Sequence, residues 1–555
     1  MIIGIDMGGT NIDGVALRNG TLVKSVKHPV DSSDFFQSVW RCLDALLDDL
    51  EYSDIERIHL STTVCTNAIV EDKVAAVGLI LQTGPGLKWQ FDRVGSSLEY
   101  VSGSIDHRGK VVQDADAARL REIKERFSRE SVETLAVVGK FSTRNSAFER
   151  QVKEYFADNY NNITMGHSLS GKLNFPRRVQ TAYLNAAVGP TFQRFIEAIS
   201  SALAQKNITA PVYLLKADGG TIDLSGARAK PVETILSGPA ASFMGMKALL
   251  ADNQTDSCFL DVGGTTTDIF FLVDGVPVFE PSGIEIDGRK TLVRAIFSTS
   301  IGLGGDSHVR ISDGMLRIGP ERLGHAVAFG GEHLTVTDAL VYLGAMRGTH
   351  TDASRSVLER TARQYSASPE VFARDIVDHM CEKIRQKIEE VLAKLNASPV
   401  YTIKELLQDR TIKPQTVAVI GGPARALAPY LEKKIGLPVI YPKHYEMANA
   451  IGAALAKPTV EITLHADTER GVLTIPELEI NEQIGKSYDL RQAAERALAE
   501  VISAGKAMGL SSEQAEAEIT EASSFNMVRG YLGADKNIRV KAQIRPGLFT
   551  EGGVM

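Results

Sequence analysis

Two segments of the chain repeat one pattern of carboxylates, glycines and a threonine. Both read D-x-G-G-T-x-x-D, and they are Asp6-Met7-Gly8-Gly9-Thr10-Asn11-Ile12-Asp13 and Asp261-Val262-Gly263-Gly264-Thr265-Thr266-Thr267-Asp268. Adjacent glycines let a backbone adopt positive φ and bring bare N–H groups close to an anion, and the threonine hydroxyl adds a donor. The pattern therefore predicts two loops that bind phosphate groups.

The aspartates that begin the two loops have a second expected role. Asp6 and Asp261 each end an apolar run that reads as a strand, so their carboxylates would point toward the bound phosphates. A carboxylate beside a phosphate requires a cation, and Mg²⁺ held largely through water satisfies this requirement. We predict that Asp6 and Asp261 are the metal and catalytic residues, whereas Asp13 and Asp268 brace their loops or Mg²⁺-bound waters. The pattern does not distinguish which carboxylate, if any, is a general base.

The elements on either side of the loops also repeat. Each copy reads as strand, loop, strand, hairpin turn and strand, with Asn19-Gly20 and Asp274-Gly275 as the turns. A loop between two strands differs from a Walker loop and from a dinucleotide-binding turn, because both of those lead into a helix. We expect one loop in each of two lobes, so that they hold the β- and γ-phosphates of ATP from opposite sides. A tight hairpin without a ligand is the alternative for either loop alone.

Two further glycine-rich segments are candidates for contacts with the rest of the nucleotide. Gly421-Gly422 follows the apolar run 417–420 and precedes a potential helix over 425–434. Base and ribose would lie against the bare backbone there, and an ordinary strand-to-helix turn is the alternative. Gly304-Gly305 lies in the segment 300–307, which we expect to contact ribose or phosphate or to line the cleft between the lobes.

Two duplicated lobes with phosphate loops and an adenosine turn resemble the actin, sugar-kinase and Hsp70 superfamily. The resemblance implies an α/β fold with two ribonuclease H-like lobes and an ATP cleft between them. We expect a first lobe over residues 1–190 with an inserted substrate-side segment, and a second lobe over 191–457. Expected strands and an amphipathic helix over 488–508 then indicate a small C-terminal α+β domain over 458–555, of unassigned role.

Six other segments match the motifs of one family. They are Thr62–Ile69 (TTVCTNAI), His167–Ser170 (HSLS), Arg178–Ala186 (RVQTAYLNA), Ala217–Gly220 (ADGG), Leu236–Ala241 (LSGPAA) and Thr335–Ala339 (TVTDA). With the two loops, they resemble the hydantoinase/oxoprolinase family, and specifically its ATP-dependent hydantoinase A-type subunit, over about residues 1–456. The chain departs from the family at Ile12, where a threonine is usual, and over 319–331, which lacks the family's Cys-Tyr and Pro-Gly-Pro run.

The resemblance implies an ATP-dependent hydrolase that opens a cyclic amide, such as a hydantoin, 5-oxoproline or a related lactam. ATP would phosphorylate the amide carbonyl oxygen, water would attack, and phosphate would leave. The resemblance covers only the A-type part and therefore allows a B-type partner subunit. Two other functions stay open: a small-molecule kinase of the sugar type, which the start 4–11 also resembles, and an ATPase that acts as a switch or reactivase on a partner protein.

Six residues of the family motifs are candidate substrate contacts. They are Thr63, Asn67, Asp218, Gly219, Gly220 and Ser237. Thr63 and Asn67 would equally serve as caps of a strand-to-helix turn, and a simple loop turn is the alternative for Asp218. We interpret His167 as a satisfied interior histidine in preference to a catalytic one.

Length, composition and charge exclude several other classes of protein. At 555 residues the chain is too long for one hydrophobic core, and its 44% apolar and 23% charged content is that of a globular protein. A formal charge of -7 without a long basic run argues against nucleic-acid binding. Separated cysteines without a CxxC pair indicate reduced thiols. We expect no signal peptide and no membrane span, and therefore a cytoplasmic protein, with oligomer formation left open.

Overall fold

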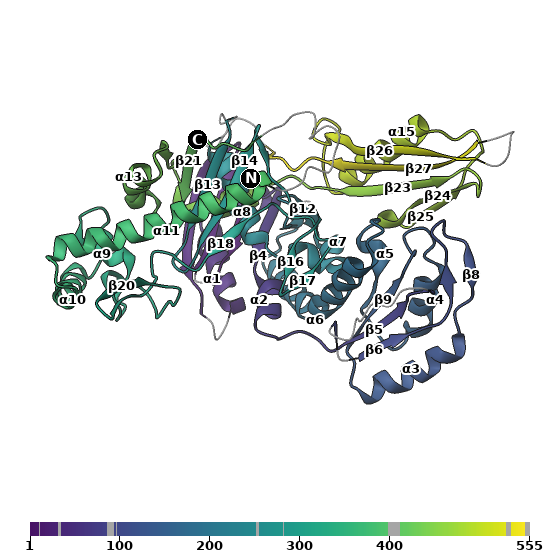
Figure 1. Ribbon diagram of the computed structural model, residues 1–555, viewed down its shortest axis with the longest axis horizontal. Coiled ribbons are helices and arrows are strands. Elements are labelled where there is room, and N and C mark those ends of the chain that lie inside the picture. The colour runs from purple at the N-terminus through teal and green to yellow at the C-terminus, as the bar shows by residue number, and fades with distance from the viewer. Residues whose placement is uncertain are drawn as a thin grey trace.

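The computed structural model describes residues 1–9, 11–31, 35–85, 94–95, 97–250, 255–280, 282–397, 411–528 and 534–549. Two sheets lie near the centre of the molecule, α9 (Val336–Tyr342) and α10 (Thr351–Gln364) lie at one end, and a smaller inserted sheet and a C-terminal sheet lie at the other (Figure 1). Thr10 of the first predicted phosphate loop lies outside the described residues.

The two central sheets share one strand order. The first runs β12-β11-β4-β1-β2-β3, and the second runs β15-β14-β13-β21-β22, with β18 also paired to β14. In each sheet three consecutive antiparallel strands are joined by parallel strands from later in the chain. The prediction of two duplicated ribonuclease H-like lobes is confirmed by this order. The strands are β1 (Ile2–Met7), β2 (Asn11–Arg18), β3 (Thr21–Pro29), β4 (Arg57–Thr62), β11 (Val212–Leu215), β12 (Thr221–Asp223), β13 (Ser257–Val262), β14 (Thr267–Val273), β15 (Val276–Pro277), β18 (Thr299–Ile301), β21 (Thr416–Ile420) and β22 (Val439–Ile440).

Apolar runs explain why these strands lie in the interior. β1 and β13 are buried along almost their whole length, because helices cover both faces of each sheet. The first sheet packs against α1 and α6, and the second packs against α11 and α13. These helices are α1 (Phe35–Leu47), α6 (Phe175–Gln205), α11 (Pro369–Ala397) and α13 (Ala424–Ile435).

Two short helices form the layer between the central sheets. α8 (Ser237–Leu249) and α14 (Ala448–Leu455) share one apolar core with residues of both sheets. A β-carbon at Gly245 would lie 2.0 Å from the Ala448 carbonyl oxygen, and one at Gly452 would lie 2.2 Å from the Ala241 carbonyl oxygen. The two helices therefore cross with backbone against backbone, which only glycine allows at these positions.

An inserted unit interrupts the first lobe. Its parallel sheet has the order β10-β9-β5-β6, and helices α3 and α4 contribute to its core. The elements are β5 (Val77–Gln82), β6 (Ser97–Tyr100), β9 (Thr134–Gly139), β10 (Ile163–Met165), α3 (Ala117–Arg129) and α4 (Ala147–Phe156). The division expected at residue 190 falls inside α6, and β11 and β12 of the first sheet follow that helix. We propose that the first lobe extends through β12, because strand pairing and not chain order defines the sheet.

The C-terminal segment folds as the small α+β domain that the sequence predicts. Its antiparallel sheet has the order β25-β24-β23-β27-β26 and packs one face against α15 (yellow in Figure 1). A capping box between Asp489 and Gln492 begins α15. The elements are β23 (Glu461–Asp467), β24 (Val472–Ile475), β25 (Ile480–Gln483), β26 (Ala517–Val528), β27 (Ala534–Ile544) and α15 (Leu490–Ala507).

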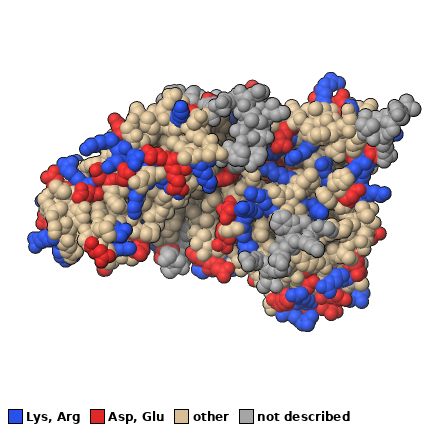
Figure 2. Space-filling model, viewed as in Figure 1, with Lys and Arg blue, Asp and Glu red and all other residues tan. Residues whose placement is uncertain are grey.

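The molecular surface carries charges of both signs. On the face in Figure 2, acidic and basic side chains are interspersed over the described residues. All four cysteines are buried free thiols. Among the residues that the structure describes, no helix is long and apolar enough to cross a membrane.

Candidate active site

The two predicted phosphate loops occupy equivalent places in the two central sheets. Asp6 lies directly opposite Asp13 across β1 and β2, and Asp261 lies directly opposite Asp268 across β13 and β14. Each loop is closed by one backbone hydrogen bond, from Gly8 N–H to Asn11 in the first copy at 3.1 Å and from Gly263 N–H to Thr266 in the second at 2.9 Å. The duplication therefore extends from strand order to the hydrogen bonds of single loops.

Four buried or partly buried carboxylates lie where the lobes join. Burial, together with the negative charges of Asp13 and Asp261, raises the pKa of Asp6 to about 7. Burial, followed by the charge of Asp261, likewise raises the pKa of Asp268 to about 7. Since the charge of Asp261 acts on Asp6 across the lobes, these two carboxylates lie close together, as the sequence predicts.

Two side chains that the motifs did not indicate hold this cluster. Nδ2 of Asn449, in the first turn of α14, donates to Oδ2 of Asp261 at 3.3 Å and also hydrogen-bonds Asp6. Ser242 Oγ donates to the same Asp261 oxygen at 2.6 Å. One amide thus bridges a carboxylate of each lobe. No motif spacing signals Asn449, since it lies 188 residues from Asp261 in sequence.

Lys27 forms an ion pair with the last aspartate of the first loop. Its Nζ lies 2.6 Å from Oδ1 and 2.7 Å from Oδ2 of Asp13, because Lys27 is the register partner of Asp13 across β2 and β3. Its charge lowers the pKa of Asp13, although burial keeps that pKa above the usual value. The Asn19-Gly20 turn alone would set Val26 opposite Asp13, but Val23 is an extra residue in β3, and this bulge shifts Lys27 into that place. The turn signal in the sequence therefore did not predict the pairing.

The other glycine segments gather around the second loop. Gly305 N–H donates to the carbonyl of Gly263 at 2.9 Å, and a β-carbon at Gly304 would lie 2.5 Å from the carbonyl oxygen of Gly264. Gly421 has a φ of +94°, and a β-carbon there would lie 2.2 Å from the Val262 carbonyl oxygen. The structure therefore brings together the segments that the sequence assigned to nucleotide.

The residues of this site fit Mg²⁺-ATP. A β-carbon at Gly9 or Gly422 would meet nothing within 4 Å, so open space adjoins bare backbone at both segments. A bound cation would offset the desolvation and mutual repulsion that raise the pKa values of Asp6, Asp261 and Asp268. No cluster of three or more His, Cys, Asp or Glu side chains close enough to hold a metal ion occurs within the described residues. The donor set thus fits a cation bound through water and phosphate oxygens.

Three of the candidate substrate residues, Thr63, Asn67 and Ser237, form hydrogen bonds within the protein. Thr63 Oγ1 donates to the Met7 carbonyl at 3.3 Å and accepts from Asn67 Nδ2 at 3.2 Å. Ser237 Oγ exchanges hydrogen bonds with the backbone of Thr62, at 2.9 Å to its carbonyl and 3.2 Å from its N–H. These bonds tie α2 (Val64–Val70) and α8 to the carboxyl ends of β1 and β4.

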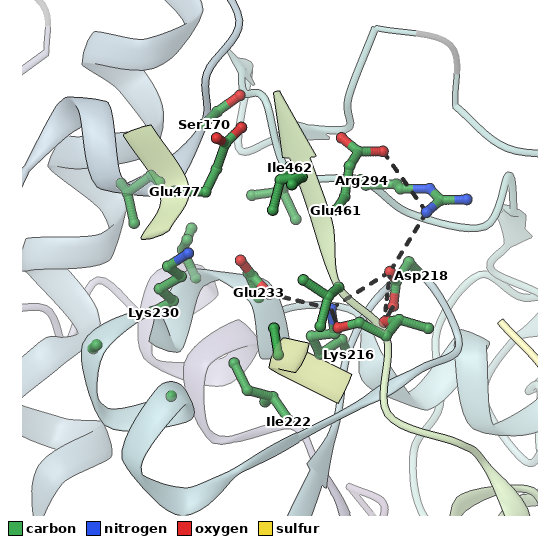
Figure 3. Close-up of a pocket in the computed structure, with 18 of the residues that line it drawn as sticks. Ser170, Lys216, Asp218, Ile222, Lys230, Glu233, Arg294, Glu461, Ile462 and Glu477 are labelled. Atoms are coloured by element: carbon green, nitrogen blue, oxygen red, sulfur yellow. Dashed lines mark hydrogen bonds and ion pairs between the residues drawn. The ribbon is translucent and has the colours of Figure 1, made fainter. Parts of the chain in front are cut away.

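Asp218, Gly219 and Gly220 follow β11, which is separated from β1 by β4 in the first sheet. Asp218 borders a cavity of about 340 Å³ whose lining includes none of the predicted nucleotide residues (Figure 3). It accepts from Gly220 N–H at 3.0 Å and from Thr459 Oγ1 at 3.0 Å. Gly219 turns the chain with a φ of +83°. The segment 218–220 is therefore a loop turn, which was one of the two predictions for Asp218. The same segment also forms part of a cavity wall.

His167 lies in the interior of the inserted unit. Its Nδ1 is 2.5 Å from Oε2 of Glu149, its backbone N–H donates to the same oxygen at 3.0 Å, and both residues are buried. His167 is not among the residues lining that cavity. The prediction that His167 is a satisfied interior histidine agrees with this placement.

The shared strand order, the paired loops and the carboxylates between the lobes define a two-lobed protein of the actin, sugar-kinase and Hsp70 type. The profile of the hydantoinase/oxoprolinase family matches residues 178–462, and that of the hydantoinase/oxoprolinase N-terminal region matches residues 2–159. The chain therefore belongs to the hydantoinase/oxoprolinase family, and the resemblance drawn from the motifs is confirmed.

Known proteins similar to this chain span both lobes. The caprolactamase subunit alpha of Pseudomonas jessenii is 24% identical over 478 residues, which cover 79% of this chain and 67% of the relative. The 5-oxoprolinase of Saccharomyces cerevisiae is 23% identical, with 64% and 28% covered. The acetophenone carboxylase gamma subunit of Aromatoleum aromaticum is 26% identical, with 66% and 57% covered. The chain thus spans between 28% and 67% of the length of these relatives.

A solved structure extends the shared fold to the C-terminal domain. The ATP-dependent caprolactamase from Pseudomonas jessenii superposes with a TM-score of 0.72 at 19% sequence identity. The match covers 98% of this chain and 87% of that chain. At this identity the likeness shows the fold alone.

Proposed function

We propose that this protein is an ATP-dependent hydrolase that opens a cyclic amide, such as a hydantoin, 5-oxoproline or another lactam. The observation that carries the proposal is the meeting of two phosphate loops and four carboxylates between duplicated lobes, in a family with relatives named caprolactamase and 5-oxoprolinase. For a lactam, the overall reaction consumes the amide, ATP and two waters. It yields the open-chain amino acid, ADP and phosphate.

In this proposal each part of the site has one task. Asp6 and Asp261 hold Mg²⁺ through its waters, and the backbone N–H groups of the two glycine loops bind the phosphates. Gly422 leaves room for the base and ribose beside α13. Lys27 and Asn449 keep Asp13 and Asp261 in place. Bound ATP supplies the phosphoryl group that activates the amide oxygen.

Phosphate release from Mg²⁺-ATP tests this function. The wild type and Asp261→Asn are compared across hydantoins, lactams, sugars and no addition, with Asp287→Asn in an exposed turn as the matched control. Stimulation by one cyclic amide, matched by ring-opened product and lost only in Asp261→Asn, is the expected result. A phosphorylated sugar as the net product, or phosphate release that ignores every amide, would contradict the proposal.

A second candidate is an ATP-dependent carboxylation. The 26% identity to a subunit of acetophenone carboxylase favours it. The same assay distinguishes the two when acetophenone and labelled bicarbonate are added, because carboxylation fixes the label into an acid and amide opening does not. Since two of the relatives are named as subunits, we also propose that a partner subunit completes the enzyme.

A further inference from the structure

The 340 Å³ cavity lies where four parts of the chain meet. Its volume is within the range of small-molecule sites, about 300–1,000 Å³. The first lobe, the inserted unit, a loop of the second lobe and the C-terminal domain all contribute to its wall. Representative lining residues are Lys216, Asp218, Ser170, Arg294, Ile462 and Ala507.

We propose that this cavity binds the cyclic amide, that Arg294 recognises a carboxylate on its ring, and that the C-terminal domain is a wall of the substrate site. The proposal rests on the function proposed above, since it names the substrate class and the place where it binds.

The position of the cavity follows from strand pairing in the first sheet. β1, β4 and β11 are parallel neighbours, with Asp6 paired to Ser61 and Leu60 paired to Leu214. Adjacent strands lie about 4.8 Å apart, so the end of β11 lies about 10 Å from Asp6 along the same edge of the sheet. Lys216 directly follows β11. The cavity therefore borders the edge that carries the first phosphate loop.

Of two cations in the wall, Arg294 has a hydrogen-bond donor left. Lys216 is 9% exposed, and its Nζ donates to the Thr459 carbonyl at 3.1 Å and lies 3.5 Å from Asp218 and 3.4 Å from Glu233, so acceptors of the protein use its three donors. Nη1 of Arg294 is buried without a hydrogen-bond partner. Its nearest acids are Glu461 at 3.8 Å and Asp218 at 4.0 Å.

Figure 3 shows these groups as a row of alternating charges. The row runs from Glu461 through Arg294 and Asp218 to Lys216 and Glu233. The Phe279 ring fixes the guanidinium of Arg294, whose Cζ lies 4.3 Å from the ring centroid. A partly buried guanidinium with an open donor matches a planar carboxylate, and charge-assisted hydrogen bonds of this kind are strong.

The rest of the wall suits the body of a small ring. Apolar side chains from several elements line it, namely Ile222, Val232, Val293, Ile462 and Leu478. A site with a mostly apolar wall and a few convergent polar groups is typical of small-molecule recognition. A lactam with a carboxylate presents methylenes and one anionic edge, which match the apolar and the polar parts of this wall.

The C-terminal domain is fitted closely against the polar part of the wall. A β-carbon at Gly220 would lie 2.1 Å from Thr459 Oγ1, and the same hydroxyl donates to Asp218. Thr221 forms a parallel bridge with Pro458. The domain thus fixes the position of Asp218, so it shapes the cavity and does not only cover it.

Calorimetric titration with two ligands tests the charge recognition. 5-Oxoproline and 2-pyrrolidinone share the lactam ring and differ in the carboxylate. We expect Arg294→Gln to weaken 5-oxoproline binding by about tenfold or more, Arg294→Lys to restore part of it, and 2-pyrrolidinone binding to stay equal in all three proteins. Unchanged affinity of Arg294→Gln for 5-oxoproline overturns the proposal.

A second pair of variants tests the contribution of the C-terminal domain. Ala507→Phe places a ring at the cavity wall from an exposed position near the end of α15, and Ala499→Phe changes an equally exposed alanine of that helix away from the cavity. Weaker 5-oxoproline binding in Ala507→Phe alone supports the proposal, and equal binding in both variants contradicts it.

These outcomes separate the cavity from the proposed function. Amide-stimulated phosphate release together with binding that is insensitive to both Arg294→Gln and Ala507→Phe would reject the cavity and retain the hydrolase. Binding that depends on Arg294, without stimulation of phosphate release by any amide, would retain the cavity as a carboxylate site and reject the hydrolase.

Discussion

Asn449 donates its side-chain amide to Asp261 at 3.3 Å, and the same amide also hydrogen-bonds Asp6. Because Asp6 lies in β1 and Asp261 lies in β13, one residue of α14 hydrogen-bonds a carboxylate of each lobe. The amide offers donors without adding a charge, which suits a place where two buried anions already repel each other.

Replacing Asn449 tests this bridge. Asn449→Leu keeps the volume and removes the donor, and we expect phosphate release to fall by about 10–100-fold, the rate equivalent of roughly 1.5–3 kcal/mol for a hydrogen bond to a charged group. Asn449→Ser retains a donor and is expected to lose less. Equal rates in Asn449→Leu and wild type, with unchanged melting temperatures, would show that the bridge has no role in the reaction.

Lys27 can be compared with Lys24, which lies on the same strand. Lys27 pairs with Asp13, whereas Lys24 of the same strand donates to the Asp48 carbonyl, away from the loop. We expect Lys27→Met to weaken ATP binding by roughly 5–30-fold, about 1–2 kcal/mol, because the Asp13 carboxylate loses its cation and the loop its brace. Lys24→Met should bind ATP as the wild type does. A fluorescent nucleotide titration measures both, and equal losses would assign the effect to general surface charge.

A substitution at Gly422 is predicted to lower ATP affinity without changing the stability of the fold. A β-carbon there meets nothing within 4 Å, and its φ is not in the left-handed region, so Gly422→Ala should fold with an unchanged melting temperature. The added methyl would occupy space assigned to the nucleotide, and ATP affinity should fall. Wild-type affinity in this variant would place the base and ribose elsewhere.

Gly452 is predicted to show the opposite behaviour. A β-carbon there would lie 2.2 Å from the Ala241 carbonyl oxygen and 2.3 Å from Gly245 N, both backbone atoms that cannot turn away. Gly452→Ala should therefore destabilise the protein by about 1–3 kcal/mol or more, as overpacking does. Thermal unfolding compares it with Gly422→Ala, and a melting temperature equal to that of the wild type would contradict the close crossing.

The Glu149 carboxylate makes the stability of the inserted unit depend on pH. Burial raises its pKa, but the charge and hydrogen bonds of His167 outweigh burial, so the pKa lies below the ordinary value of 4.5. A depressed carboxylate pKa stabilises the fold above the unfolded value and loses that effect as pH falls through the folded value. The melting temperature of wild type should exceed that of Glu149→Gln at pH 7, and the gap should narrow below about pH 4.5. A gap that is constant with pH would argue against an ionised Glu149.

Sequence alone predicted the parts of the site that are local. The D-x-G-G-T-x-x-D spacing sets Asp6 opposite Asp13 and Asp261 opposite Asp268, because a short loop between antiparallel strands fixes their register. Glycine pairs also marked the segments that gather around Val262.

Features that depend on contacts between residues far apart in the chain were not predicted from the sequence. Asn449 belongs to a helix of small apolar residues that reads as core, and only the fold brings it to Asp261. β11 and β12 lie beyond the division expected at residue 190 but pair with the first sheet, and a long helix separates them in sequence from those strands. The C-terminal domain carried no motif, so its contact with Asp218 through Thr459 was visible only in the structure.

The crossing of α8 and α14 restricts how the cleft can open. At Gly245 and Gly452 the two helices touch through main-chain atoms, which cannot change rotamer to absorb displacement as side chains do. Sliding of one sheet past the other would drive these atoms together, whereas rotation about the contact would keep their separation. The admission of nucleotide and the release of ADP should therefore proceed by a hinge-like rotation with its axis at these two glycines.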